Sequence, residues 1–200
     1  AGSTLTTPQV SVGTNGSGSS LLFAEDGGSI QVDLLQLGDT APEEGSFGEA
    51  AATGGGTIFA DQISLFPRGT LSVNGGRILV DRISVGGSTE AMSLSDPTSG
   101  PALIIGTTGG SSTFNNLIED NLGGPGSINK EGNGTLTLGG ANTLSGGVTI
   151  HRGTLLATNT SGSATGTGDV TVMNPATLGG TGTCAGTVAV QSGGTIAPGA

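Results

Sequence analysis

Aromatic side chains and positive charge are both scarce in this chain. Its 200 residues include five phenylalanines, no tyrosine, no tryptophan and only five lysines and arginines. Sandwiches and closed barrels usually place some large rings in their wide interior, so the shortage of aromatics favours a narrow fold with an aliphatic core. Five basic residues cannot build a surface that tracks a phosphate backbone, so we expect no nucleic-acid partner.

Long apolar runs and cysteine pairs are also missing. No apolar run approaches the roughly 20 residues that cross a bilayer, so we expect no membrane insertion by this chain. Cys184 is the only cysteine, which excludes a disulfide within the chain. It lies in an alternating run, where a buried small residue is one interpretation and a disulfide to a second chain is the other. Cys184 is therefore the candidate interchain contact.

The residues that are present favour strands over disorder and over helices. Glycine (41 residues) and proline (8 residues) are abundant enough to suggest low complexity. However, the apolar residues alternate with polar ones in short runs bounded by Gly, Asn and Ser, which is typical of β-strands. Examples are residues 30–32, 135–138 and 170–172. No stretch of ten or more residues has a convincing helical period, so the sequence predicts an all-β protein.

A Gly-Thr-Leu motif recurs through the last third of the chain. The copies begin at Gly134, Gly153, Ala176 and Gly194, with steps of 19, 23 and 18 residues. A fixed period of this size is typical of stacked structural units. Two hundred residues would form about ten rungs of about twenty residues each. The sequence thus predicts a solenoid with loop insertions.

A second, weaker repeat occupies the N-terminal part. Residues 27–37, 55–65 and 75–85 share the pattern Gly-Gly-x-Ile-x-x-Asp-x-apolar-x-apolar. We expect each Gly-Gly pair to supply the positive φ of a sharp corner. The isoleucines should begin an inward-facing stripe, and the aspartates should fall at a second corner; they are Ile30, Ile58, Ile78, Asp33, Asp61 and Asp81.

Unrepeated segments are where we expect partners to bind. The acidic segment 38–53 lengthens the first N-terminal step to 28 residues, and an irregular segment spans residues 88–100. Insertions of this kind map to one face of a solenoid and often mark its binding surface. Both ends of the chain also lack a visible capping helix, and an uncapped rung can stack on another.

Two groups of carboxylates and amides are candidate calcium sites. Asp33, Asp61 and Asp81 would stack at about 4.8 Å per rung, and stacked carboxylates repel unless a cation or proton intervenes. The favoured alternative is that each aspartate caps a corner through backbone N–H groups. Residues 115–121 hold a similar cluster, for which we again favour a structural role, with Asn side chains satisfying buried backbone groups.

No residue pattern indicates catalysis or a cofactor. His151 is the only histidine, and it has no Cys, Asp or Ser partner nearby in sequence, so a surface position is favoured. There is no Gly-x-Ser-x-Gly elbow, phosphate loop or Cys-x-x-Cys pair. We therefore expect a protein that is not an enzyme.

Residues 111–200 carry a family resemblance. The run Gly132-Asn133-Gly134-Thr135-Leu136-Thr137-Leu138 is followed by Gly140-Ala141-Asn142-Thr143-Leu144-Ser145-Gly146-Gly147-Val148-Thr149-Ile150 and later by Gly193-Gly194-Thr195-Ile196-Ala197-Pro198-Gly199. This spacing resembles the autotransporter-associated β-strand repeat of bacterial surface passenger domains. The resemblance implies a right-handed parallel β-helix displayed outside the cell, and it implies no catalytic activity.

Together these observations predict one solenoid domain over residues 1–200. Residues 1–110 would form the divergent Gly-Gly-x-Ile-x-x-Asp rungs and residues 111–200 the autotransporter-associated rungs. The expected function is structural or adhesive, with head-to-tail self-association into a surface filament or sheath. The alternatives are a carbohydrate-binding or carbohydrate-cleaving β-helix and a passive stalk of a larger passenger. Expected partners are further copies, surface glycans or a neighbouring cell surface, at a secreted or outer-surface location.

Overall fold

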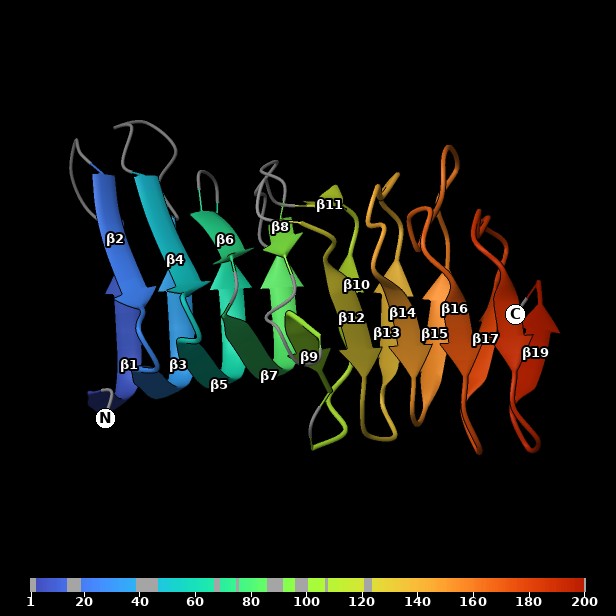
Figure 1. The fold of residues 1–200 in the computed structure, drawn as a ribbon, viewed down its shortest axis with the longest axis horizontal. Helices are drawn as coiled ribbons and strands as arrows, with labels where there is room; N and C mark the ends of the chain where they lie inside the picture. Colours follow the sequence, from blue (N-terminus) through green and yellow to red (C-terminus); the bar gives the residue numbers. More distant parts are fainter. Residues whose placement is uncertain are drawn as a thin grey trace.

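The computed structural model describes residues 3–13, 19–38, 47–66, 69–74, 76–85, 92–95, 101–106, 108–120 and 124–199. Within these ranges every regular element is a β-strand, and there is no helix. The strands form three sheets in which all paired neighbours run parallel. Figure 1 shows them stacked along one axis, with the two termini at opposite ends. The all-β prediction is confirmed for this part of the chain.

The first sheet runs the whole length of the stack. Its nine strands, in spatial order, are β1 (Thr4–Val12), β3 (Ser29–Leu37), β5 (Thr57–Leu65), β7 (Arg77–Val85), β9 (Leu103–Ile105), β12 (Ser127–Lys130), β14 (Gly147–Ile150), β16 (Val170–Val172) and β18 (Val188–Val190). Their spatial order follows their order in the sequence, so each one opens a new turn of the chain. The predicted number of about ten rungs stays a prediction.

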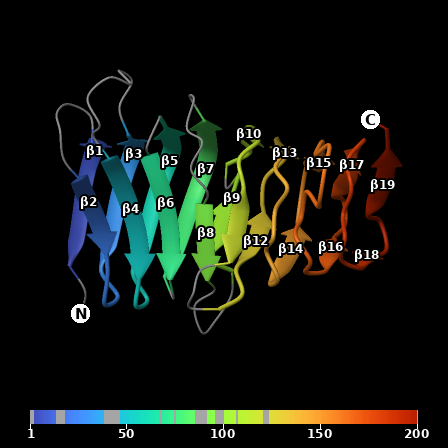
Figure 2. The same ribbon diagram turned by 90° about the horizontal axis from the view of Figure 1, so that it is seen from above.

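Two shorter sheets form the other faces. One contains β2 (Ser19–Ala24), β4 (Phe47–Thr53), β6 (Gly69–Asn74), β8 (Met92–Ser95) and β11 (Ile118–Asp120). The other contains β10 (Ser112–Phe114), β13 (Thr135–Leu138), β15 (Thr154–Ala157), β17 (Thr177–Gly180) and β19 (Thr195–Pro198). Figure 2 shows the sheet that begins with β2 over the N-terminal part of the stack and the sheet that begins with β10 over the C-terminal part.

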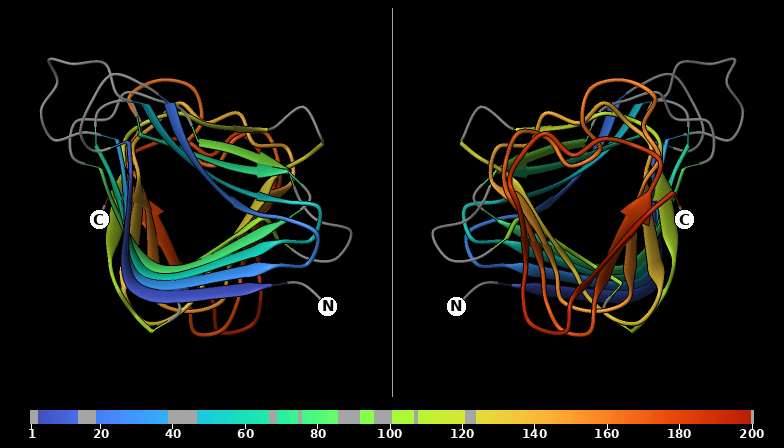
Figure 3. Two further views of the ribbon diagram at one scale, coloured as in Figure 1. Left: turned by 90° about the vertical axis from the view of Figure 1, so that its left-hand side faces the viewer. Right: turned by 90° about the vertical axis from the view of Figure 1, so that its right-hand side faces the viewer.

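The chain winds as a solenoid around a narrow core. Viewed from its N-terminal end, each turn runs clockwise as it recedes, which is the right-handed sense expected for parallel strands (Figure 3). The nine-residue strands β1, β3, β5 and β7 bend and so supply two sides of each turn (Figure 3). The hydrogen-bonded ladder between these strands is interrupted at Asp33, Asp61 and Asp81 and continues on both sides of them. The aspartates therefore lie at the bend, as predicted.

Aliphatic columns fill the interior along the axis. Ile30, Ile58 and Ile78 lie in register on adjacent strands and are 3% exposed or less, which confirms the predicted inward stripe. The column continues through the residues Leu103, Ile128, Val148 and Val170. Each residue packs on its counterparts one turn above and below, so burial comes from stacking neighbouring rungs.

The two positions of each Gly-Gly corner require glycine for different structural reasons. The first has a positive φ, at 73° for Gly27 and 83° for Gly55, as the pattern predicted; its counterpart in the third copy lies outside the described residues. The second is in close contact with the turn below. A Cβ on Gly56 would overlap the Ala24 carbonyl, and one on Gly76 would lie 2.5 Å from the Ala52 carbonyl carbon.

The two segments expected to loop out contain strands. Residues 47–53 of the acidic segment are β4, in which Ala50 and Ala52 are fully buried, and residues 92–95 of the second segment are β8, with Met92 and Leu94 buried. The prediction of continuous loops was therefore wrong for these residues. Residues 39–46, 88–91 and 96–100 lie outside the described part of the chain.

Candidate functional site

The predicted aspartate column exists, but its members have different environments. The ladder register places Asp33 opposite Asp61 and Asp61 opposite Asp81. Asp33 and Asp61 are exposed, whereas Asp81 is 7% exposed. The three carboxylates therefore share a line along the corner of the solenoid without sharing a role.

Asp81 caps the following turn of the solenoid. Its Oδ1 accepts hydrogen bonds from the backbone N–H groups of Thr108 and Gly110, each 2.9 Å long. Burial raises the pKa of the Asp81 carboxyl, but the bonds from Gly110 and Thr108 and the nearby Arg82 outweigh it, so the net pKa lies below its ordinary value. This geometry is the capping role favoured for the aspartates, with the cap on the next rung.

The calcium alternative for the aspartate column stays a prediction. Among the described residues, no group of three or more His, Cys, Asp or Glu side chains is arranged to hold a metal ion. What Asp33 and Asp61 do share is an open groove of about 270 Å³ on the outer side of β3, β5 and β7. Gln31, Phe59 and Leu79 also line it, so the groove combines acidic and apolar surface.

The second cluster of carboxylates and amides is organised around Asp120. The Asp120 carboxylate accepts hydrogen bonds from the Gly126 N–H at 2.8 Å, the Ser145 N–H at 3.1 Å and the Ser145 hydroxyl at 2.5 Å. Burial raises its pKa, but the bonds from Ser145 and Gly126 outweigh this effect and leave the pKa lowered. The favoured structural role therefore holds for Asp120, whereas Asn121 lies outside the described residues.

Buried asparagines also satisfy backbone groups. They lie in the C-terminal turns, on the face that carries the sheet of β2, β4, β6, β8 and β11 in the earlier turns. The Asn142 side chain accepts a 2.8 Å bond from the Ile118 N–H and donates a 2.5 Å bond to the Ala164 carbonyl. Asn159 accepts from the Thr183 N–H at 2.9 Å. These amides link successive turns where no ladder does. The sequence predicted the role but assigned it to residues 115–121.

Lys130 is the functional-looking residue that the sequence analysis missed. Its side chain occupies an inward position in register with Ile105 and Ile150 and is 1% exposed. The Nζ donates hydrogen bonds to the carbonyls of Glu131, Gly132 (3.0 Å) and Arg152 (3.4 Å). Burial lowers the pKa of the amine, although the carboxylates of Glu131 and Asp81 partly counteract it. The alternation Ile128-x-Lys130 was the signal for its inward position.

His151 lies near one carboxylate, and Cys184 packs against the core. The His151 imidazole Nε2 lies 3.7 Å from Glu131 Oε1, and the ring is partly exposed at the surface. Cys184 has a free thiol, is partly buried and packs against the core. That contact supports the small-apolar interpretation, and the interchain disulfide stays a prediction.

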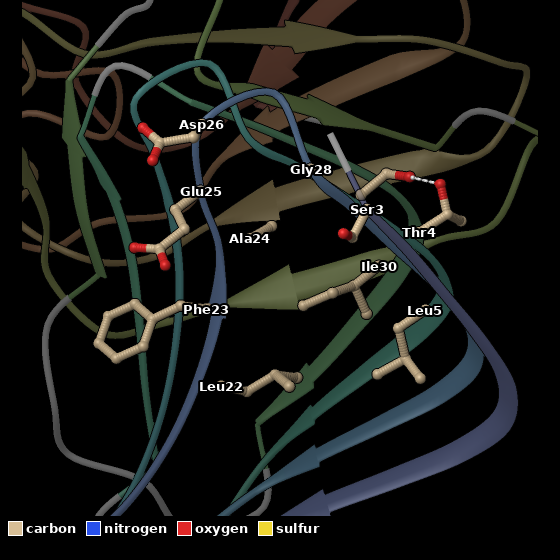
Figure 4. A pocket seen from close by; sticks show the side chains of 11 residues that line it. Ser3, Thr4, Leu5, Leu22, Phe23, Ala24, Glu25, Asp26, Gly28 and Ile30 are labelled. Carbon is tan, nitrogen blue, oxygen red and sulfur yellow. Dashed lines mark hydrogen bonds between the residues drawn. The ribbon is translucent and has the colours of Figure 1, made fainter. Parts of the chain in front are cut away.

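An open cavity lies at the N-terminal end of the stack. It measures about 530 Å³, and Figure 4 shows the core residues Leu5, Leu22 and Ile30 beside the carboxylates Glu25 and Asp26. Leu5 begins the inward column and is 46% exposed because no turn covers it within the described residues. At the other end, Val190 and Ile196 are 42% and 48% exposed.

Comparison with known proteins identifies part of the chain. Residues 128–157, which cover β13 to β15 and most of β12, match the family model described as passenger-associated-transport-repeat. The search of curated proteins and that of solved structures give no match. No helix among the described residues has the length and hydropathy to cross a membrane. The resemblance noted in the sequence is confirmed over residues 128–157, which are similar to a passenger-associated repeat.

Proposed function

We propose that this chain is a structural segment of an extracellular or surface-exposed passenger, without catalytic activity. The passenger-associated repeat at residues 128–157 supports this location and class. The observation that carries the structural role is the continuous nine-strand sheet, which extends one core along the whole stack. Asp81, Asp120 and Lys130, whose pKa values are perturbed, each hydrogen-bond groups of the fold itself.

End-to-end stacking is the finer part of the proposal. Strands β1 and β2 are edge strands at one end, and β18 and β19 are edge strands at the other. Edge strands with exposed apolar neighbours are templates for a further strand. The occupant is another turn of solenoid, supplied by the same polypeptide where it extends further or by a second copy.

The distribution of charge favours head-to-tail over head-to-head contact. Glu25 and Asp26 border the N-terminal cavity, whereas residues 170–200 contain no charged side chain. Two N-terminal ends would bring like charges together, but an N-terminal and a C-terminal end would not. Head-to-tail contacts do not close, so they produce fibres.

Sedimentation velocity and electron microscopy of the 200-residue polypeptide test this arrangement. We expect concentration-dependent fibres, which Leu5→Lys or Ile196→Lys abolishes because each places a charge in the end-to-end contact. The matched control is Leu21→Lys, since Leu21 is 54% exposed on β2 but does not line the cavity. Discrete monomers at high concentration would exclude self-stacking but would leave the structural role intact. Turnover in a glycan-depolymerisation assay would contradict the structural role itself.

A further inference from the structure

An apolar stripe runs along the outer side of three adjacent turns. Phe59, Leu79 and Ile104 lie in register on β5, β7 and β9, on the side of the strands that faces away from the core. Phe59 is 41% exposed. The same outer position holds Gln31 before the stripe and Asn129, Thr149 and Thr171 after it. The stripe is therefore a local departure from a polar surface, and the 270 Å³ groove lies over its Phe59 and Leu79 part.

Two carboxylates along the groove have no partner among the described residues. Asp33 and Asp61 line the groove one rung apart, about 4.8 Å in a parallel stack. Asp81 and Asp120, in contrast, each accept backbone N–H groups. Like charges at one rung's separation repel, and a positive group placed between them removes that repulsion.

The chemistry of the groove limits what can occupy it. Two copies meeting through this same face would bring four carboxylates together, and an anionic polymer would meet the same repulsion. An extended peptide would find no free backbone groups, because β3, β5 and β7 are paired on both sides. A pyranose ring has an apolar face that can stack on Phe59 and Leu79. An amino group on that ring can bind the carboxylates and lie near the Phe59 ring.

We propose that the outer groove of β3, β5 and β7 binds a glycan bearing free amino groups, with a sugar ring on Phe59 and one ammonium group between Asp33 and Asp61. A single ammonium group can pair with both carboxylates, since they lie one rung apart, about 4.8 Å. This binding function is separate from end-to-end stacking because the groove lies on the side of the solenoid.

Isothermal titration calorimetry with a six-unit β-1,4-linked glucosamine oligomer tests the site. We expect saturable binding whose affinity falls about tenfold or more in Phe59→Ala and in the double variant Asp33→Asn/Asp61→Asn. The Phe59→Tyr variant, which keeps the aromatic ring, should retain the affinity. The matched charge control is Glu25→Gln/Asp26→Asn, which also removes two carboxylates, in the end cavity. This control should bind like the unaltered chain. Unfolding midpoints confirm that each variant is folded.

Four results would overturn the proposal. They are no binding of the oligomer, equal weakening by the Glu25→Gln/Asp26→Asn control, binding that is indifferent to Phe59→Ala, and equally tight binding of the N-acetylated oligomer or of hexalysine. The N-acetylated oligomer distinguishes an amino-glycan site from a neutral-sugar site, and hexalysine distinguishes it from a site for any cation. Each of these measurements is independent of whether the chain forms fibres, so the two proposals can fail separately.

Discussion

At the scale of single residues, polar side chains in this solenoid stabilise junctions between turns. Asp81 holds the turn at residues 108–110, Asp120 holds Gly126 and Ser145, and Lys130 holds carbonyls from two turns. Backbone N–H and carbonyl groups at a corner lack a ladder partner, so a side-chain acceptor for the N–H groups or a side-chain donor for the carbonyls takes the place of water. Charged residues that would suggest a functional site in a globular enzyme are therefore structural here.

Replacing Lys130 tests this interpretation. Lys130→Met keeps the length of the side chain but leaves three carbonyls without their donor, which should lower the free energy of unfolding by about 1–3 kcal/mol at neutral pH. Arg152→Met is the matched control, because it removes one positive charge from an exposed side chain on the adjacent turn. Urea unfolding followed by circular dichroism measures both, and an equal effect of the two changes would contradict the role of Lys130.

The pH dependence of the same variant tests the desolvation of the amine. Burial lowers the pKa of Lys130 in the folded state below the unfolded value of about 10.4, so the unfolded state binds more protons between these two values. The stability that Lys130 contributes is therefore largest above about pH 10.4 and falls as pH decreases through the folded pKa. Lys130 is the only lysine and tyrosine is absent, so a Cys184→Ala background leaves no other side chain of these types to titrate at high pH. In that background, the difference in free energy of unfolding between the chain with Lys130 and the Lys130→Met variant should increase toward high pH. A gap that is constant with pH would contradict desolvation.

At the scale of elements, close approach between turns explains why the repeat carries glycines in pairs. Gly55 has φ +83°, and a Cβ there would lie 4.0 Å from the Gly27 nitrogen, an ordinary contact, whereas a Cβ on Gly56 would overlap the Ala24 carbonyl. Positive φ could be predicted from the pattern, but the contact with the next turn could not, because it depends on how tightly two segments 32 residues apart stack.

Substituting each glycine separates the two effects. Gly55→Ala should cost about 1 kcal/mol, the conformational penalty of positive φ. Gly56→Ala should cost more, since the two turns must move apart and break ladder bonds. Thermal unfolding of both variants makes the comparison, with Gly55→Ala as the control for the loss of a glycine. A smaller loss for Gly56→Ala than for Gly55→Ala would show that the corner can relax.

The strands that the sequence predicted correctly are those with alternating apolar residues. The column of Ile30, Ile58 and Ile78 could be read directly from the Gly-Gly-x-Ile pattern. β4 could not be read in this way, because Ala50, Ala51 and Ala52 are all buried and a run of alanine has no alternation of apolar and polar residues. The Gly-Gly-x-Ile pattern also aligns Phe59 with Leu79, whereas the position of Ile104 beside Leu79 could not be read from it, because residues 101–105 lie outside the repeat.

At the scale of the whole molecule, charge is distributed unequally along the axis. Residues 1–131 contain 14 of the 15 carboxylates, and residues 170–200 contain no charged side chain. Repulsion between carboxylates therefore acts on the N-terminal turns and spares the last ones. Salt weakens such repulsion, because the Debye length falls from about 30 Å at 0.01 M to about 8 Å at 0.15 M ionic strength.

Hydrogen exchange measured by mass spectrometry tests this asymmetry. Between low and physiological salt, amide exchange in residues 19–85 should slow, whereas exchange in residues 170–199 should change little. The C-terminal peptides are an internal control for general effects of salt on exchange. A uniform slowing along the chain would show that charge does not limit the stability of the N-terminal turns.

The fully buried lysine has a consequence for how such a molecule can change length. In most of the stack an inward column repeats one kind of side chain, so a turn could be duplicated or deleted and the columns would still match. The turns joined by Lys130 are different, because its ammonium must meet carbonyls on its own turn and on the next, with Asp81 nearby. A deletion of one of these two turns would remove either the lysine or part of the set of carbonyls that it binds. We therefore expect changes in repeat number to be tolerated better on either side of this point than within it.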